Sequence, residues 1–117
     1  MGFQVHPREV GEVVVIEAVG RLTLTEGHTK LRDVVHVSAS GGSKRFILNL
    51  ARVETIDSYG IGELVRCYSV VRQAGGEMKL AGVNKKVSDV LEISRLNTFF
   101  EIYADEAAAL RAFCTSP

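Results

Sequence analysis

Apolar residues along this chain gather in short, nearly continuous runs of strand length, separated by longer segments with a different spacing. The first, Gln4 to Val10, is a shorter extended candidate with few apolar residues, and the others are Glu12 to Val19, Arg45 to Leu50, Met78 to Val83 and Phe99 to Tyr103. The run that begins at Arg45 is almost entirely apolar, which is typical of a strand covered on both faces. Pro7 interrupts the first run and therefore predicts that this strand lies at an edge of its sheet.

Between these runs, apolar residues recur at the spacing of amphipathic helices. The predicted helices are Thr23 to Ser40, a segment carrying Ile61, Leu64, Val65, Tyr68 and Val71, a short helix after Asn84, and Glu106 to Phe113. Thr23 and Glu26 have the spacing of a capping box, while Asn84 and Asp105 are typical N-cap residues. Pairs of glycines end the first two helices, and a turn is expected at Glu54 to Asp57.

The alternation of strands and helices predicts an α/β fold. Units of this kind place parallel strands side by side through right-handed crossovers. We therefore expect a mainly parallel, sequentially ordered sheet of about five strands, with an antiparallel N-terminal strand and about four helices. At 117 residues the chain has the length of a single domain, expected over residues 1–117 with a core of about 4–113.

Composition and charge exclude several classes of function. Lysine plus arginine number 14, as do aspartate plus glutamate, so the chain has no net positive charge to hold nucleic acid or an anionic membrane. The longest aliphatic stretch, Val13 to Ile16, is far shorter than the ~20 residues of a membrane span. The two cysteines are distant and the first residues do not have the pattern of a signal peptide, so we expect a protein of the reducing cytoplasm.

Residues that could bind a metal or a cofactor do not form a recognisable site in the sequence. His6, His28 and His36 lie on different elements or faces, so no metal is expected. The Gly-x-Gly at 60–62 lacks the third glycine of a dinucleotide-binding fingerprint, so no cofactor is expected either. Cys67 falls among aliphatic residues and is expected to pack in the core.

The most distinctive segment is Ile56 to Gly62, where a strand-to-helix turn carries a hydroxyl at the expected helix start. Its sequence is Ile-Asp-Ser-Tyr-Gly-Ile-Gly. In one interpretation Ser58 is an N-cap that satisfies the first N–H groups of the helix, a contribution of about 1 kcal/mol. In the other, Ser58 is a functional residue. The spacing alone leaves both interpretations open.

Three parts of the sequence together resemble the STAS domain of bacterial anti-sigma factor antagonists. They are Leu48 to Leu50, the turn from Ile56 to Gly62, and the pair Gly75-Gly76 before a strand. The resemblance continues through residues 91–94 and 99–108 and covers nearly the whole chain, from Gly20 to Leu110. It implies that the helices lie mostly on one side of the sheet. The same domain also occurs in scaffold, lipid-transport and anion-transporter proteins.

The resemblance implies a switch between partners that is controlled by phosphorylation. In that family the unmodified antagonist binds an anti-sigma factor that is also a serine kinase. The kinase phosphorylates the serine of the D-S-x-G turn, and a metal-dependent Ser/Thr phosphatase removes the phosphate. Ser58 is the matching phosphoacceptor here. The residues expected to contact the partner are Thr23, Asp57, Ser58, Tyr59, Gly60 and Ile61.

Elementary physics favours a phosphate at this turn. A helix N-terminus has a positive dipole end, so the modified domain should stay folded. Gly60 and Gly62 are expected to leave the backbone open to a partner. The chain departs from the family at two positions. Thr23 stands where many relatives have an acidic residue, so this loop lacks an acidic contact for the kinase, and Arg95 stands where relatives often have a helix-ending glycine.

The sequence supplies no general base beside Ser58, so we expect a kinase substrate rather than an enzyme. Two other functions stay open. The chain could be a scaffold or complex subunit that is not phosphorylated, or a module that binds a nucleotide or lipid in a cleft near Ser58 and Lys85-Lys86. Weak self-association is also left open as a further interaction.

Overall fold

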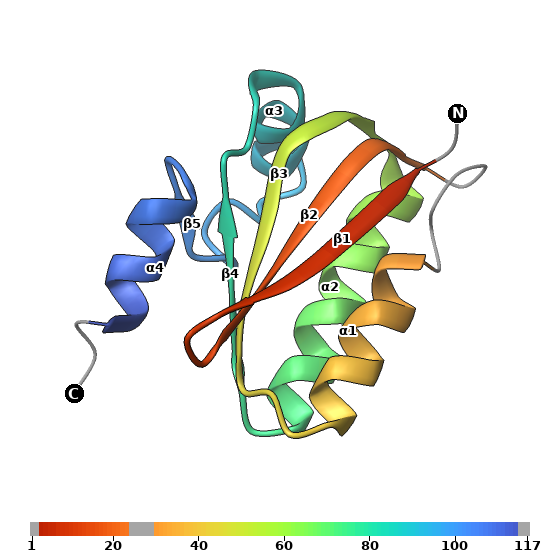
Figure 1. Ribbon diagram of the computed structural model, residues 1–117. Helices are drawn as coiled ribbons and strands as arrows, with labels where there is room; N and C mark the ends of the chain where they lie inside the picture. The colour runs from red at the N-terminus through yellow and green to blue at the C-terminus, as the bar shows by residue number, and fades with distance from the viewer. Residues whose placement is uncertain (1–2, 24–29, 115–117) are drawn as a thin grey trace.

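The computed structural model describes residues 3–23 and 30–114, which form one five-stranded sheet with four helices (Figure 1). The strands are β1 (Gln4–Val10), β2 (Val13–Leu22), β3 (Arg45–Ile56), β4 (Glu77–Ala81) and β5 (Ile102–Tyr103). The helices are α1 (Lys30–Ser40), α2 (Ser58–Gln73), α3 (Lys85–Ile93) and α4 (Glu106–Cys114). The strand order is β1-β2-β3-β4-β5, with β1 antiparallel to β2 and the other neighbours parallel. The predicted fold class, strand order and antiparallel first strand are confirmed.

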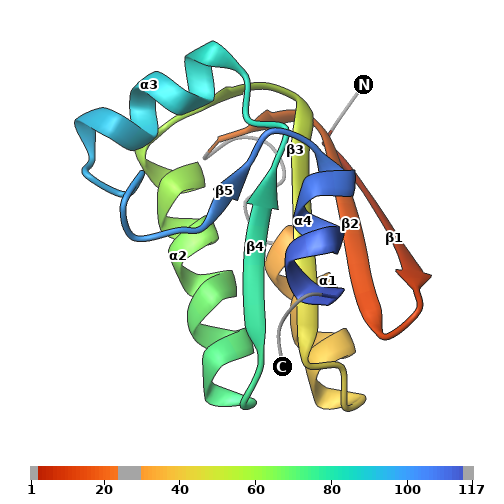
Figure 2. The same ribbon diagram turned by 90° about the vertical axis from the view of Figure 1, so that its left-hand side faces the viewer.

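Helices α1 and α2 cover one face of the sheet, and α4 covers part of the other (Figure 2). The larger core lies under α1 and α2 and also takes in α3, with Leu31, Leu64 and Leu91 fully buried. The smaller core lies under α4, where Phe113 packs with Val15 and other residues of the sheet. Three of the four described helices contribute to the larger core, which confirms that the helices lie mostly on one side.

The predicted edge strand and the predicted helix caps at Asn84 and Asp105 are confirmed. Pro7 lies in β1, which is the first strand of the sheet and pairs with β2 alone. Asn84 caps α3 by accepting the N–H of Val87 at 2.9 Å. Asp105 begins α4 in the same way, accepting the N–H of Ala108 at 2.8 Å. Each cap satisfies a backbone donor that the first turn of a helix leaves without a partner.

Arg95 ends α3 in the left-handed conformation, with φ of 62°, as expected for the position where relatives often have glycine. The N–H of Arg95 donates to the carbonyl of Glu92 at 3.0 Å, and the N–H of Leu96 donates to the carbonyl of Leu91 at 2.8 Å. These two bonds form a Schellman motif, in which the residue after the C-cap takes a positive φ. Leu96 packs against the larger core and accompanies the motif with an apolar contact.

Several predicted boundaries were wrong. The helix predicted from Thr23 is described as α1 from Lys30 onward, and Thr23 itself forms a β-bridge directly after β2, so the helix does not begin at Thr23. Its expected partner Glu26 lies outside the described residues, as does His28. The turn predicted at Glu54 to Asp57 lies mostly within β3, because β3 stays paired with β2 as far as Ile56.

The last strand is also shorter than predicted, since only Ile102 and Tyr103 pair with β4. Phe99 and Phe100 instead turn back, both donating their N–H groups to the carbonyl of Leu96, and their rings contact Tyr68. Packing between aromatic rings therefore replaces strand pairing in this segment.

Candidate functional site

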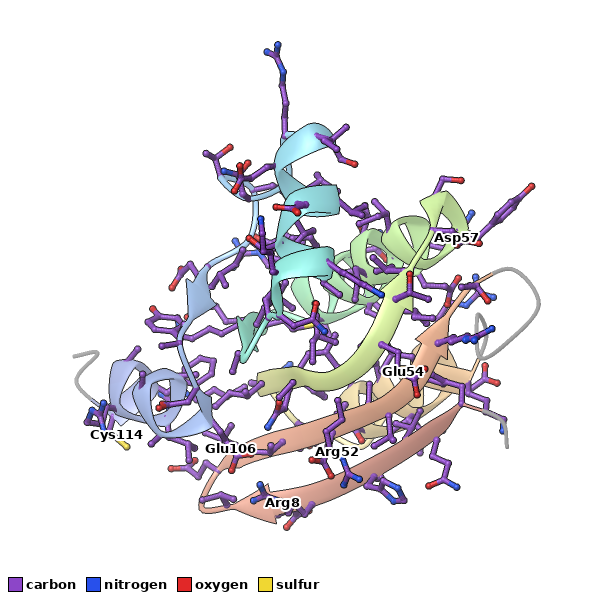
Figure 3. The ribbon with its side chains drawn as sticks, turned by 90° about the horizontal axis from the view of Figure 1, so that it is seen from above. Arg8, Arg52, Glu54, Asp57, Glu106 and Cys114 are labelled. Carbon is purple, nitrogen blue, oxygen red and sulfur yellow. The ribbon has the colours of Figure 1, made fainter. Side chains whose placement is uncertain are left out.

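The turn between β3 and α2 positions Ser58 as the first residue of the helix, with Asp57 as the N-cap. Asp57 has extended backbone angles, and its Oδ1 accepts the N–H of Gly60 at 2.9 Å. Its backbone carbonyl accepts the N–H of Ile61, also at 2.9 Å. Figure 3 shows Asp57 at this junction, seen from above. The interpretation of Ser58 as the N-cap is therefore wrong, because the neighbouring aspartate fills that role.

Gly60 fixes how closely α2 approaches the end of β2. A Cβ atom on Gly60 would lie 2.1 Å from the carbonyl oxygen of Leu22 and 2.6 Å from Cγ1 of Ile56. The N–H of Asp57 also donates to the Leu22 carbonyl, at 3.4 Å. The expectation that Gly60 opens the backbone to a partner is wrong, because Gly60 is buried against its own chain. At Gly62 a Cβ atom would meet only ordinary contact, 3.5 Å from Nη1 of Arg66.

The expected contact residues differ in what they offer a partner. Ser58 is exposed, and the side chain of Tyr59 beside it is 54% exposed. Asp57 is half-buried, as is Thr23, which directly follows the Leu22 carbonyl on which α2 rests. Gly60 and Ile61 are buried, so they shape the turn from below. The structure thus exposes Ser58 and Tyr59 above the buried Gly60 and Ile61, while Thr23 follows directly on Leu22, the residue that the start of α2 contacts.

A cluster of charged side chains around Glu63 was missed in the sequence. Glu63 is only 2% exposed, and its Oε1 lies 3.1 Å from Nη1 of Arg66 and 3.7 Å from Nη1 of Arg32 on α1. Within the described residues, Oε2 of Glu63 has no hydrogen-bond partner. The spacing of three between Glu63 and Arg66 is a helical ion-pair signal that was available in the sequence. The contact with Arg32 joins two helices and has no local signal.

Cys67 lies next to this cluster and is buried, as expected for a packing residue. Burial raises the pKa of its thiol to about 12, and the negative charge of Glu63 adds to the rise. A thiol with so high a pKa stays protonated and unreactive at neutral pH. Cys67 therefore serves the core and not the chemistry of the site.

A second charged cluster was also missed, on the opposite face of the sheet. Lys79 of β4 is only 4% exposed, and its Nζ lies 2.6 Å from Oε1 of Glu101 and 4.6 Å from the centre of the Phe113 ring. Burial alone would lower the pKa of Lys79, but the hydrogen bond and charge of Glu101 outweigh it and raise the pKa. The same bond from Lys79, with a second from Tyr103, lowers the pKa of Glu101. This cluster ties α4 to the sheet, far from Ser58 along the chain.

Lys85 and Lys86 are exposed at the start of α3, and Lys85 lies 3.3 Å from Asp89 one turn later. The N-cap Asn84 also donates to the carbonyl of Val53 at 2.6 Å, which ties this helix start to β3. In the described part of the chain, no three histidine, cysteine, aspartate or glutamate side chains gather as a metal site. None of the described helices has the length and apolar character needed to cross a membrane.

Comparison with known proteins assigns the chain that carries this turn to a family. The STAS domain family matches residues 4–109. The chain belongs to the STAS domain family. This STAS domain is 29% identical over 115 residues to the anti-sigma F factor antagonist of Paenibacillus polymyxa, with 94% of each chain covered.

Solved structures agree with this assignment. A crystal structure of a Thermotoga maritima protein, described as a candidate anti-sigma factor antagonist, superposes on the STAS domain with a TM-score of 0.85 and 25% identity, covering 92% of each chain. The phosphorylated form of SpoIIAA from Bacillus has the same fold, with a TM-score of 0.69 and 22% identity over 95% of this chain and 99% of that one.

Proposed function

We propose that this STAS domain is an anti-sigma factor antagonist whose binding to an anti-sigma factor is controlled by phosphorylation of Ser58. The partner binds the surface formed by Ser58, Tyr59 and Thr23, and serine kinase activity in that partner modifies Ser58. A Ser/Thr phosphatase restores the unmodified form. The names of the relatives support the antagonist role, and a neighbour solved in its phosphorylated form supports the switch. The proposed role is regulatory and implies a cytoplasmic protein in a bacterium.

The observation that carries the proposal is that Asp57, and not Ser58, caps α2. Asp57 caps α2 through its Oδ1, while Ser58 is exposed at the first helical position. A kinase can therefore modify Ser58 without removing the cap. The phosphate would sit at the positive end of the α2 dipole, where a negative charge is favourable. Modification is compatible with the fold and acts at the surface.

The effect of the phosphate falls on the interface. A phosphoserine carries about −1.5 to −2 charges at neutral pH and a strongly hydrated group. Packing a partner against Ser58 and Tyr59 would require that group to lose water within a buried surface, which costs several kcal/mol unless the partner supplies matching cations. The complex formed by the unmodified chain therefore dissociates when Ser58 is phosphorylated.

The proposal is tested by incubating the protein with its cognate anti-sigma factor and ATP, then measuring intact mass and mapping the modified peptide. We expect a mass gain of one phosphate, located on Ser58, and no gain for Ser58→Ala. Tyr59→Phe is the matched control, because it removes the neighbouring hydroxyl and should be modified like the wild type. A phosphate mapped elsewhere would contradict the proposal. Tight binding without any modification would favour the scaffold function instead.

A further inference from the structure

Arg66 folds back along α2 toward the start of the helix. Its Nη1 lies 3.5 Å from the position that a Cβ atom on Gly62 would occupy, and 3.1 Å from Oε1 of Glu63. The Arg66 side chain is 58% exposed, so its guanidinium is held at the surface and not in the core. The guanidinium therefore lies beside the bare backbone of Gly62, at ordinary contact distance from where a Cβ atom would be.

Ser58, Gly62 and Arg66 are spaced four residues apart and share one stripe along α2. Side chains at this spacing have Cβ atoms about 5–6 Å apart, so Nη1 of Arg66 lies within about 9 Å of the Ser58 Cβ atom. The missing side chain at Gly62 leaves this path along the helix surface open. The exposed side chain of Arg66 can extend along this stripe toward a phosphate on Ser58 by rotation about its side-chain bonds.

We propose that Arg66 binds the phosphate on Ser58 within the same chain. The inference rests on the proposed function, since it assigns a receiving group to the phosphate of the switch. Arginine suits this role because its planar fork of N–H donors matches phosphate oxygens. Glu63 competes for the same guanidinium, but it offers a single negative charge, whereas the phosphate offers nearly two and three acceptor oxygens.

Glu63 can release Arg66 without losing all of its charge compensation. The same Oε1 atom also lies 3.7 Å from Nη1 of Arg32, which stays in place on α1. Phosphorylation therefore transfers Arg66 from Glu63 to the phosphate and leaves the Arg32 contact. A phosphate that is already paired with Arg66 gains less from any cation on a partner, which reinforces dissociation of the complex.

The test uses full-length protein with phosphoserine encoded at position 58 during synthesis, so no kinase is needed. A ³¹P NMR titration gives the second pKa of the phosphate, ordinarily about 6. A nearby cation favours the dianion and lowers that pKa, so Arg66→Gln should raise it by at least about 0.3 pH unit, and Arg66→Lys should largely restore the wild-type value. Arg72→Gln is the matched control, since Arg72 lies in the last turn of α2 and should leave the titration unchanged.

A second readout needs no change to the Glu63 cluster. In the wild-type phosphoprotein, the Nε–H signal of Arg66 should shift with the same midpoint as the phosphate, while that of Arg72 should not. Equal phosphate pKa values in wild type and Arg66→Gln would overturn the inference, as would an Arg66 Nε–H signal whose position does not change as the phosphate titrates. Because the phosphoserine is encoded, neither result depends on whether a kinase modifies Ser58, so this test and that of the proposed function fail separately.

Discussion

Gly60 and Leu22 approach so closely that a single methyl group on Gly60 would lie 2.1 Å from the carbonyl oxygen of Leu22. This contact joins the first turn of α2 to the end of β2, two segments separated by more than thirty residues. It holds the first turn of α2, which carries Ser58, against the end of β2, which leads into Thr23. The exposed serine is therefore positioned by backbone packing beneath it.

Gly60→Ala should destabilise the domain by about 2 kcal/mol or more, because the added methyl group overlaps backbone that cannot move freely. Urea denaturation of the purified variant measures this loss. Gly62→Ala is the matched control: its Cβ atom meets ordinary contact at 3.5 Å, and alanine in a helix is up to about 1 kcal/mol more favourable than glycine. Equal stability of the two variants would contradict the packing described for Gly60.

Features decided by a few neighbouring residues could be predicted from the sequence. Asn84 and Asp105 cap helices through bonds to residues three positions later, and Arg95 ends α3 through bonds to the preceding turn. The end of β3 depends instead on pairing of Ile56 with Leu22, which no local pattern reports. The choice of Asp57 over Ser58 as N-cap follows from that strand end, so it could not be predicted either.

The charged clusters likewise combine contacts between residues close in sequence with contacts that depend on tertiary packing. Glu63 and Arg66 are close in sequence and could have been paired by spacing, whereas Arg32 reaches Glu63 from another helix. Lys79 and Glu101 meet because β4 and β5 are neighbours in the sheet, and the burial of Lys79 follows from α4 lying over it. Contacts of this kind depend on tertiary packing, which one sequence does not contain as a local pattern.

Arg95→Gly should stabilise the domain by roughly 0.5–1 kcal/mol. A non-glycine residue in the left-handed conformation costs about 1–2 kcal/mol, and the greater backbone entropy of unfolded glycine offsets part of the gain. Thermal unfolding followed by circular dichroism measures the change. Arg95→Ala serves as the control, because it removes the same charge and keeps the strained backbone. A melting temperature for Arg95→Gly below that of Arg95→Ala would show that φ of 62° carries no strain here.

The ion pair between Lys79 and Glu101 should make the free energy of unfolding depend on pH in the acidic range. The pKa of Glu101 is lowered from 4.5 in the folded state, so its contribution is present above pH 4.5 and is lost as the pH falls through the folded pKa. Lys79→Met removes this contribution, and we expect the wild type to lose stability relative to the variant as the pH falls below 4.5, by well under about 1 kcal/mol because the Glu101 side chain is 58% exposed.

Urea denaturation at several pH values measures this difference, with Lys86→Met as the control that removes an exposed lysine. At basic pH the dependence runs in the opposite direction. The pKa of Lys79 is raised from 10.5, so its contribution to the free energy of unfolding is present below pH 10.5 and is lost as the pH rises through the folded pKa. A stability difference between wild type and Lys79→Met that stays constant from pH 3 to pH 7 would rule out the Lys79–Glu101 pair as a source of acid sensitivity.

The central claim is that one phosphate on Ser58 controls partner binding while the domain stays folded. Isothermal titration calorimetry of the anti-sigma factor into the unmodified and the phosphoserine-58 protein tests it most directly. We expect at least about a hundredfold loss of affinity on phosphorylation, with full affinity for Ser58→Ala and an intermediate loss for Ser58→Asp, which carries about half the charge. Affinities that agree within about threefold, under 1 kcal/mol, for the unmodified and phosphorylated proteins would contradict the account.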